Sequence, residues 1–325
     1  MRVGKPLVLA LCAIMAAGML FAGGCSRGEK FPSKPIEVIV GWGAGGGTDI
    51  FTRNVVPAAE EILGVSIAVV NMPGAASATA MDYVMKQPAD GYTVFAITSD
   101  ILPNAVLGRT PYTPQDLRPL IRAHVDIGLI QVGKKSPFNT WEELVAYAKQ
   151  NPGKVTIGGT GAGSYDEVAV AAVTRSAGLD VEYVPFDSAS EMHAALMGGH
   201  IMAMYEETGP AIGMIESGDV WPVLVFAEER LERFPDVPCV KELGLDLPPL
   251  QWRGLAVKKG TPEEVCKILE DAFAKACESQ QYKEFASKRF LDLYPGFLRG
   301  ADFAKSLEDE LKQYEEILKQ LGYKK

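Results

Sequence analysis

Three short stretches rich in glycine and small residues each separate a β-prone run from a helical run. They are residues 41–49, 71–77 and 158–164. Glycine leaves room for a ligand and permits positive φ, so successive backbone N–H groups can converge on an anion where a helix begins. In open α/β sheets ligands lie beyond the carboxyl ends of the strands, where these turns are expected. Together the turns predict a cleft for an anion such as a carboxylate, although each alone could be tight packing without a ligand.

Several charged residues near these turns are candidates for ligand contact. Asp49 stands at the expected start of the first helix, where an N-cap is favoured over contact with ligand-bound water. Glu206 and Glu207 follow a buried-looking strand, which leaves ligand contact and solvated charge equally open. Trp252 is interpreted as a core residue, whereas Arg253 could pair with a ligand carboxylate in bidentate geometry.

Enzyme chemistry finds little support in the sequence. The first turn formally matches G-x-G-x-x-G, but the second strand is expected to end at Asn71 and not at the acidic residue that a dinucleotide site requires. His124, His193 and His200 are scattered, and no H-E-x-x-H or G-x-S-x-G string occurs. We therefore predict no catalytic residue, no cofactor and, without a C-x-x-C pair, no metal site.

Alternating β-branched and helical runs indicate an α/β fold. Strands are expected at 36–40, 66–70, 93–97, 155–158, 181–184, 201–205, 220–226 and 252–257. Helices are expected at 49–63, 76–86, 141–150, 165–177, 190–198, from Thr261 onward, and at 303–321. The stretch 103–114 is expected to be rich in turns. A long β-prone segment, 117–132, is broken at 123–126, which indicates a crossing between two lobes, and a second crossing is expected near Leu250.

The first residues are typical of an export signal. Arg2 and Lys5 precede an apolar run at 6–21 and then Cys25, so residues 1–24 are predicted to be a signal peptide. The residues before Cys25 resemble a lipobox, which would make this cysteine an acylated anchor and residues 25–34 a tether. The alternative is an ordinary cleaved signal. The apolar run is short for a bilayer span and no second one follows, which excludes a multi-pass membrane protein.

Charge and cysteine content exclude further classes. The formal net charge is −9, and without a basic stripe the chain is a poor nucleic-acid binder. Cys239, Cys266 and Cys277 remain in the mature part of the chain and are predicted to be free thiols. Cys266 and Cys277 lie on one predicted helix, about 16 Å apart at 1.5 Å per residue, which is too far for a disulfide. We expect the protein to act as a monomer.

The order and spacing of several short segments carry a family resemblance. They are residues 32–36, 45–49, 71–75, 89–93, 161–164, 184–186, 235–238 and 254–262. Over nearly its whole mature length the chain resembles the solute receptors of the tripartite tricarboxylate transporter family, the Bug-type periplasmic binding proteins. The resemblance implies a type II periplasmic-binding-protein fold with a two-stranded hinge, with lobe 1 at 31–124 plus 250–325 and lobe 2 at 125–249.

The resemblance also implies a function. The protein would be a periplasmic or cell-surface receptor, anchored through lipidated Cys25, that captures a small carboxylate-containing solute and delivers it to membrane transporter subunits. Two alternatives stay open: a receptor that presents its ligand to a membrane signalling system, and an exported α/β enzyme.

The family pattern assigns candidate ligand-binding residues by position. In the first lobe they are Gly46, Thr48, Asp49, Ala75, Ala76, Ser77, Thr98 and Ser99, and in the second Gly163, Ser164, Phe186 and Glu206. This chain has Asp187-Ser188-Ala189 where the family usually carries Lys-Gly-Gly, and the family's later aspartate is shifted to Glu206-Glu207. These departures predict a more acidic distal pocket. The ligand would carry one carboxylate and a polar or cationic far end, as an organic acid or an amino-acid-like solute does.

Overall fold

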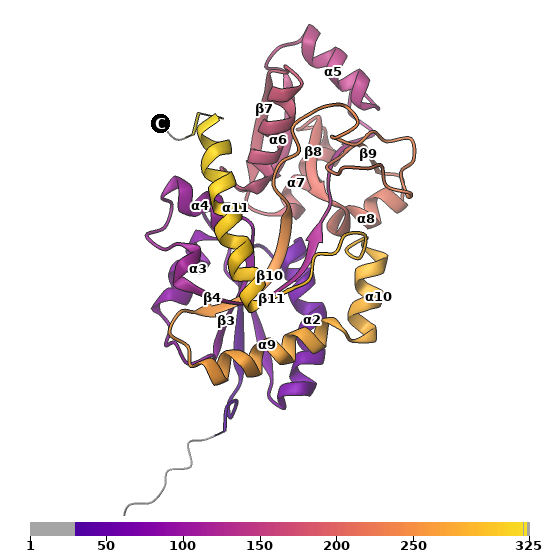
Figure 1. Ribbon diagram of the computed structural model, residues 1–325. Helices are drawn as coiled ribbons and strands as arrows, with labels where there is room; N and C mark the ends of the chain where they lie inside the picture. The colour runs from indigo at the N-terminus through magenta and orange to yellow at the C-terminus, as the bar shows by residue number, and fades with distance from the viewer. Residues whose placement is uncertain (1–29, 321, 324–325) are drawn as a thin grey trace, which may run out of the picture. The chain divides into compact units, whose positions relative to one another are not determined.

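The computed structural model describes residues 30–320, 322 and 323. Within them, the chain from Lys34 onward forms one compact unit that contains two β-sheets (Figure 1). The predicted signal peptide, Cys25 and most of the predicted tether lie outside the described residues. Across the described range, no helix has both the length and the apolar character that a bilayer span requires.

The first sheet combines strands from both ends of the chain. It contains β1 (Ile36–Val40), β2 (Ile67–Asn71), β3 (Thr93–Thr98), β4 (Leu117–Asp126), β10 (Gln251–Lys258) and β11 (Leu298–Arg299). The strand order is β11-β4-β10-β3-β1-β2; β1 is parallel to β2 and β3, and β10 is antiparallel to β3 and β4. The central strands β1 and β3 are nearly continuous apolar runs because helices cover both of their faces.

Helices pack on both faces of this sheet. They are α2 (Gly47–Leu63), α3 (Ala78–Lys86), α4 (Ile101–Leu107), α9 (Glu263–Cys277), α10 (Gln280–Lys288) and α11 (Gly300–Gln320), with a 3₁₀ turn η1 (Pro114–Asp116). Within the sheet, β2 lies next to β1 on one side and β3 lies next to β1 on the other. The crossover from β1 to β2 and the crossover from β2 to β3 therefore run in opposite directions along the sheet. Right-handed crossovers therefore place α2 and α3 on opposite faces, and Figure 1 shows α3 and α4 on one side with α2 and α10 on the other.

The second sheet comes from the middle of the chain. Its strands are β5 (Gly128–Gly133), β6 (Val155–Thr160), β7 (Val181–Phe186), β8 (Ala203–Glu207) and β9 (Val220–Val225), in the order β7-β6-β8-β5-β9. Its helices are α5 (Trp141–Gln150), α6 (Tyr165–Ser176), α7 (Ala189–Gly198) and α8 (Thr208–Glu216). The predicted α/β class with two lobes is confirmed, with one sheet at the core of each.

The chain passes from one sheet to the other twice. Ile127 alone separates β4 from β5, and residues 226–250 join β9 to β10. The break expected at 123–126 falls later because β4 stays paired with β10 up to Asp126, opposite Gln251. The lobe boundaries at 124/125 and 249/250 stay a prediction.

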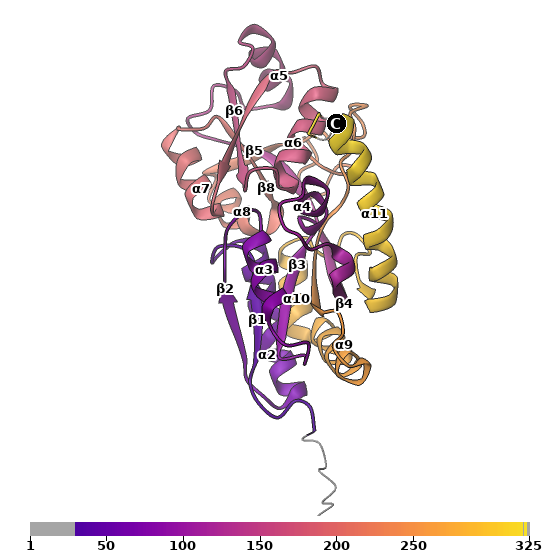
Figure 2. The same ribbon diagram turned by 90° about the vertical axis from the view of Figure 1, so that its left-hand side faces the viewer.

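The last helix runs beside both sheets. Trp252 of β10 packs edge-on against Phe303 near the start of α11, with ring centroids 4.9 Å apart. Beyond the helix, the Tyr323 hydroxyl donates to Glu167 on α6 at 2.6 Å. Figure 2 shows α11 extending from the level of β4 past α4 toward α6.

Two local expectations were wrong. The stretch predicted to be rich in turns contains α4, in which Pro103 is tolerated because the first helical turn needs no N–H from it. α2 begins at Gly47 with Gly46 as its N-cap, so Asp49 is not the cap.

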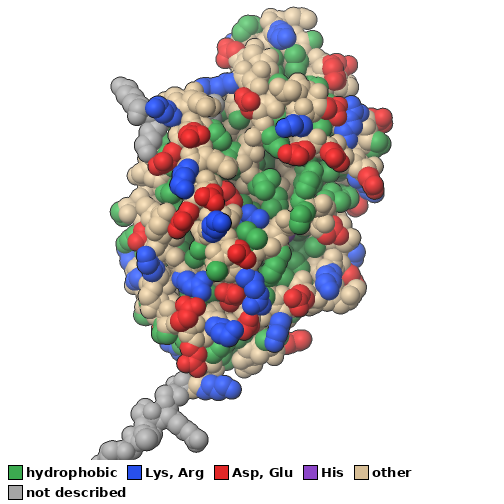
Figure 3. Space-filling view, in the orientation of Figure 1, with side chains coloured by type: hydrophobic (Ala, Val, Ile, Leu, Met, Phe, Trp, Pro, Cys, Tyr) green, Lys and Arg blue, Asp and Glu red, His purple; other side chains and the backbone are tan. Residues whose placement is uncertain are grey.

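The state of the cysteines agrees with the sequence prediction, and the surface carries mixed charges. Cys239, Cys266 and Cys277 are free, as predicted, with Cys266 and Cys277 at separate ends of α9. On the face shown in Figure 3, acidic and basic side chains are interspersed, and apolar side chains gather in a central hollow.

Candidate functional site

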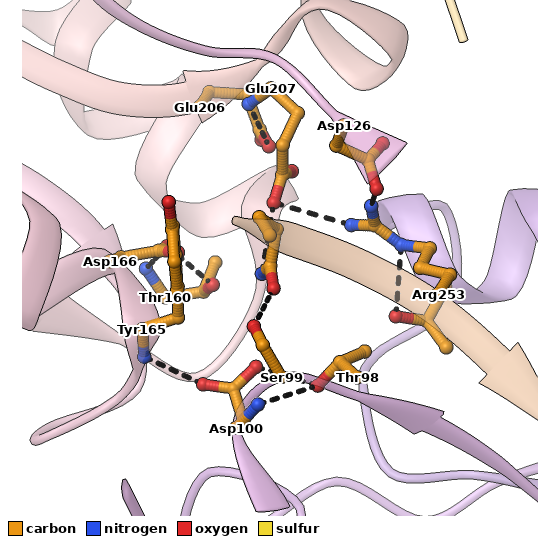
Figure 4. Close-up of polar contacts among 12 residues, drawn as sticks. Thr98, Ser99, Asp100, Asp126, Thr160, Tyr165, Asp166, Glu206, Glu207 and Arg253 are labelled. Carbon is orange, nitrogen blue, oxygen red and sulfur yellow. Dashed lines mark hydrogen bonds and ion pairs between the residues drawn. The ribbon is translucent and has the colours of Figure 1, made fainter. Parts of the chain in front are cut away.

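A narrow cavity lies between the two sheets, beyond the carboxyl ends of β1, β3, β6, β7 and β8. Its empty space is about 420 Å³, including the part that opens to solvent. The lining residues are Trp42, Gly43, Gly46, Gly47, Thr48, Thr98, Asp100, Thr160, Asp166, Asp187, Ser188, Ala189, Glu206, Glu207, Gln251 and Arg253. This is the position at which open α/β sheets bind their ligands. In Figure 4 acidic side chains approach this centre from both sheets.

The structure brings only part of the predicted site to the cavity. Of the predicted residues, Gly46, Thr48, Thr98, Asp187, Glu206 and Arg253 line it. The others, which do not belong to the lining, are Asp49, Ala75, Ala76, Ser77, Ser99, Gly163, Ser164 and Phe186. The ligand-binding role of each of these residues stays a prediction.

Arg253 is buried at one wall of the cavity and bound on three sides. Its Nη1 pairs with Asp126, its Nη2 lies 3.3 Å from Glu207 Oε1, and its Nε donates to Thr48 Oγ1 at 3.3 Å (Figure 4). His124 Nε2 lies 3.5 Å from the same Asp126 carboxylate. Burial alone would raise the pKa of Asp126, but the Arg253 guanidinium and His124 outweigh it and hold that pKa below its ordinary value.

The first helix begins directly under this guanidinium. A Cβ at Gly47 would collide with the Arg253 guanidinium, so glycine is needed for the arginine to lie across the helix start. The first N–H groups of a helix have no intrahelical acceptor, and the helix dipole favours an anion there. Gly47 and Thr48 both line the cavity, so α2 presents its N-terminus to any bound solute.

Asp49 does not line the cavity but stabilises the first glycine-rich turn, residues 41–49. One carboxylate oxygen accepts from the Gly45 amide at 2.9 Å, and the other accepts from Arg53 Nε at 2.8 Å and from Asn71 Nδ2 at 2.9 Å. These contacts tie the glycine-rich turn to the end of β2. Asp49 is thus a positioning residue in this structure.

The second turn has an unusual backbone. Ala75, Ala76 and Ser77 have φ values of 49°, 49° and 75°, a run of left-handed residues that side chains ordinarily disfavour. Asn104 Nδ2 holds the run by donating to the Ala76 carbonyl at 2.6 Å. At Gly41 a Cβ would collide with the Ser77 side chain, so the first and second turns pack closely against each other.

Asp100, Asp166 and Glu206 form the acidic side of the cavity. Asp100 accepts from Thr98 Oγ1 at 2.7 Å and, across the two sheets, from the Tyr165 amide at 2.7 Å. Asp166 accepts from the amide and the hydroxyl of Thr160, both at 2.8 Å. Burial is the main cause that raises the pKa of all three carboxyls above their ordinary values.

Glu206 and Glu207 were left open between ligand contact and solvated charge, and both are buried. Glu206 Oε2 lies 3.0 Å from His193 Nε2, and its Oε1 accepts from the Glu207 amide at 3.1 Å. Burial lowers the pKa of His193, which favours a neutral imidazole. Glu207 instead accepts a hydrogen bond from Gln251 Nε2 at 3.3 Å and forms an ion pair with Arg253.

Sequence reasoning missed Trp42, Asp100, Asp166 and Gln251 as lining residues. A usable signal was present for Asp100, which lies two residues after the end of β3, just as Asp187 directly follows β7 and Glu207 ends β8. Asp166 lies instead in the first turn of α6. No such signal marks Gln251, which begins a returning strand. Among the described residues, no group of three or more histidine, cysteine, aspartate or glutamate side chains has the geometry to hold a metal ion.

A cavity enclosed between two α/β lobes, lined by helix starts and strand ends, defines the class of two-lobed solute-binding proteins. Residues 51–323 match the tripartite tricarboxylate transporter family receptor, and the chain belongs to this family. It is therefore a transporter's solute-binding receptor and not an enzyme.

Individual relatives and solved structures are similar to the chain over most of its length. The chain is 32% identical to the "UPF0065 protein in gbd 5′ region" of Cupriavidus necator, over 96% of this chain and 95% of that protein. A solved TctC solute-binding protein from Polaromonas is 32% identical with a TM-score of 0.66, covering 89% of this chain and 99% of that one. MatC from Rhodopseudomonas palustris with bound malate shares the fold, with a TM-score of 0.80 at 23% identity, covering 89% and 100%.

Proposed function

We propose that this receptor captures a small carboxylate-containing solute in the cavity between its sheets and delivers it to the membrane subunits of a tripartite transporter. The observation that carries the proposal is the cavity itself, at which the N-terminus of α2 and the Arg253 side chain meet. Structures of the same fold are described as a periplasmic transporter and a periplasmic binding protein, and the protein is a periplasmic solute-binding protein.

The carboxylate of the solute binds at the start of α2. Two features support this position: the unpaired N–H groups of a helix start, and the Thr48 hydroxyl next to the Arg253 guanidinium. The bound malate of MatC, which has the same fold, is a carboxylate as well.

Binding and closure are coupled through a hinge of two crossings, Ile127 and residues 226–250. In this conformation the sheets are joined by the bond from the Tyr165 amide to Asp100, and the Tyr165 hydroxyl donates to the Pro249 carbonyl at 2.8 Å. A solute that contacts both lobes stabilises the closed form, because a ligand shifts an equilibrium by its difference in affinity for the two states.

The anchor is part of the proposal. Acylated Cys25 holds the receptor at the membrane, with residues 25–34 as its tether. Cys25→Ser is expected to release the protein from the membrane fraction without changing its solute affinity. Retention of this variant in the membrane would contradict the lipid anchor.

The central experiment is native mass spectrometry of protein purified without refolding, followed by calorimetry with carboxylates of increasing length. We expect a co-purified carboxylic acid that can be exchanged and recovered unchanged. Thr48→Val should weaken its binding about 10-fold by removing one hydrogen bond at the helix start. Glu182→Gln, on an exposed side chain of β7, is the matched control. Absence of binding by every carboxylate would overturn the proposal.

A further inference from the structure

We propose that the solute carries a protonated amine or a guanidinium group in addition to its carboxylate, and that Asp166 and Glu206 bind this cationic group. This inference rests on the proposed function and narrows its substrate class. It separates this receptor from one that binds a simple dicarboxylate.

The charge balance of the cavity is the first argument. Its lining contains five acidic side chains, Asp100, Asp166, Asp187, Glu206 and Glu207, but one basic side chain, Arg253. Arg253 is already paired with Asp126 and Glu207. Within the described residues, no lysine or arginine lies within ion-pair distance of Asp100, Asp166 or Glu206. A second ligand carboxylate at this side would face buried negative charge, which is unfavourable at short range.

The unused acceptor of Asp166 is the second argument. The residue is 5% exposed and lines the cavity, and both bonds from Thr160 reach the same oxygen, Oδ2. The structure gives the other oxygen, Oδ1, no hydrogen-bond donor among the described residues. An ammonium or guanidinium group donates to such an oxygen and supplies the missing positive charge.

The surroundings of Glu206 also favour a cationic ligand group. Its nearest partner other than the backbone is His193, which burial favours in the neutral form. A neutral imidazole shares a hydrogen bond with the carboxyl but supplies no compensating charge. Trp42, the aromatic residue in the lining, adds a ring of the kind that attracts cations. A divalent metal fits less well, since no described group of three acidic, histidine or cysteine side chains has metal-binding geometry.

Matched ligand pairs test the inference directly. The probes are succinate against β-alanine and glutarate against 4-aminobutyrate, in which an amine replaces one carboxylate at equal chain length, together with a panel of α-amino acids and the corresponding diamines. Calorimetry at pH 7 is expected to show binding of amino-carboxylates and at least 10-fold weaker binding of the matched dicarboxylates.

Two variants identify the residues responsible. Asp166→Asn and Glu206→Gln each keep the shape of the side chain and remove its charge. Each is expected to weaken amino-carboxylate binding about 10- to 100-fold, the range for losing a hydrogen bond to a charged group. Glu182→Gln should change affinity less than twofold. Circular dichroism confirms that each variant is folded, and Glu206→Gln serves as the test if Asp166→Asn does not fold.

The outcomes separate this inference from the proposed function. Tight dicarboxylate binding that is unchanged or strengthened in Glu206→Gln would overturn the amine assignment and leave a carboxylate receptor in place. Binding of diamines in preference to every carboxylate would overturn the proposed carboxylate site instead. Binding by no member of the panel, or a co-purified solute without nitrogen, would also overturn the amine assignment.

Discussion

Two groups of buried carboxylates lie at or beside the same cavity but are stabilised in different ways. At the Arg253 wall, Asp126 and Glu207 contact the guanidinium, and His124 adds a further contact to Asp126. At the opposite side, Asp166 accepts from Thr160 and Glu206 accepts from the Glu207 amide and lies 3.0 Å from His193, but no lysine or arginine of the described chain is within ion-pair distance of either. The first group is compensated by a cation of the protein, and the second has no lysine or arginine partner among the described residues.

The difference separates carboxylates that the protein itself neutralises from carboxylates that it does not neutralise. An ion pair that is complete without ligand stabilises the fold and orients the helix start, whereas acids that lack a cation are costly to bury and are typical of binding sites. The directions of the pKa shifts follow this division, since the pKa of Asp126 is lowered and those of Asp166 and Glu206 are raised.

The largest effect is expected from removing the cation that pairs with Asp126 and Glu207. Arg253→Met would leave Asp126 and Glu207 buried without their cation and should lower the free energy of unfolding by roughly 3–5 kcal/mol, the usual cost of removing one partner from a buried ion pair. Urea denaturation measures this loss. Arg253→Lys keeps the charge but loses the planar fork and should be destabilised less. A loss below about 1 kcal/mol in the methionine variant would show that the pair is not structurally important.

A smaller effect is expected from crowding the same guanidinium. Gly47→Ala places a methyl group against Arg253 and should cost about 1–3 kcal/mol of stability, as overpacking does in a closed core. Gly213→Ala in α8 is the matched control, because a Cβ there meets open space. Alanine should stabilise that helix by about 0.5–1 kcal/mol. Equal effects at the two glycines would contradict a specific role for Gly47.

The smallest expected effect is a difference in how the two groups of carboxyls make stability depend on pH. A carboxyl whose pKa is raised on folding holds more protons in the folded state, so stability falls as pH rises from about 4 through the raised pKa. Asp166 faces Glu207 on β8, Asp100 after β3 and Thr160 on β6, and Glu206 faces Glu207, Asp166, His193 and Arg253. Asp166→Asn should reduce this pH-dependent loss of stability, measured by urea unfolding at a series of pH values.

The Asp126 side should respond in the opposite direction. Its lowered pKa contributes stability above the ordinary carboxyl pKa, and that stability is lost as pH falls through the lowered value. Asp126→Asn should therefore lower stability across the neutral limb without changing its slope, and should reduce the fall in stability on the acid limb. The comparison of the two sides fails if both variants alter the slope of the same limb.

Much of the fold was predictable because periodicity and turn chemistry are local. The sequence predicted helix α5 with its observed bounds, and it placed the start of α6 at Tyr165, after the Ser164 N-cap. It missed α4 and α8, where proline and glycine lower helix propensity and tertiary packing decides the outcome. Asp49 was assigned to the cap because its side chain suits that position, but its partners come from β2 and from the turn before the helix.

The sequence by itself determined the α/β class, the free thiols, the glycine-rich turns and the family to which the chain belongs. Each of these depends on composition, on local pattern or on the order of short motifs. Only the tertiary structure decided which acids share one cavity and which of them meet Arg253. Asp100, Asp166 and Glu207 are far apart in the chain and share one cavity because the ends of β3 and β8 and the start of α6 come together between the two sheets. The electrostatics of a buried carboxylate depend on such neighbours, which no local pattern encodes.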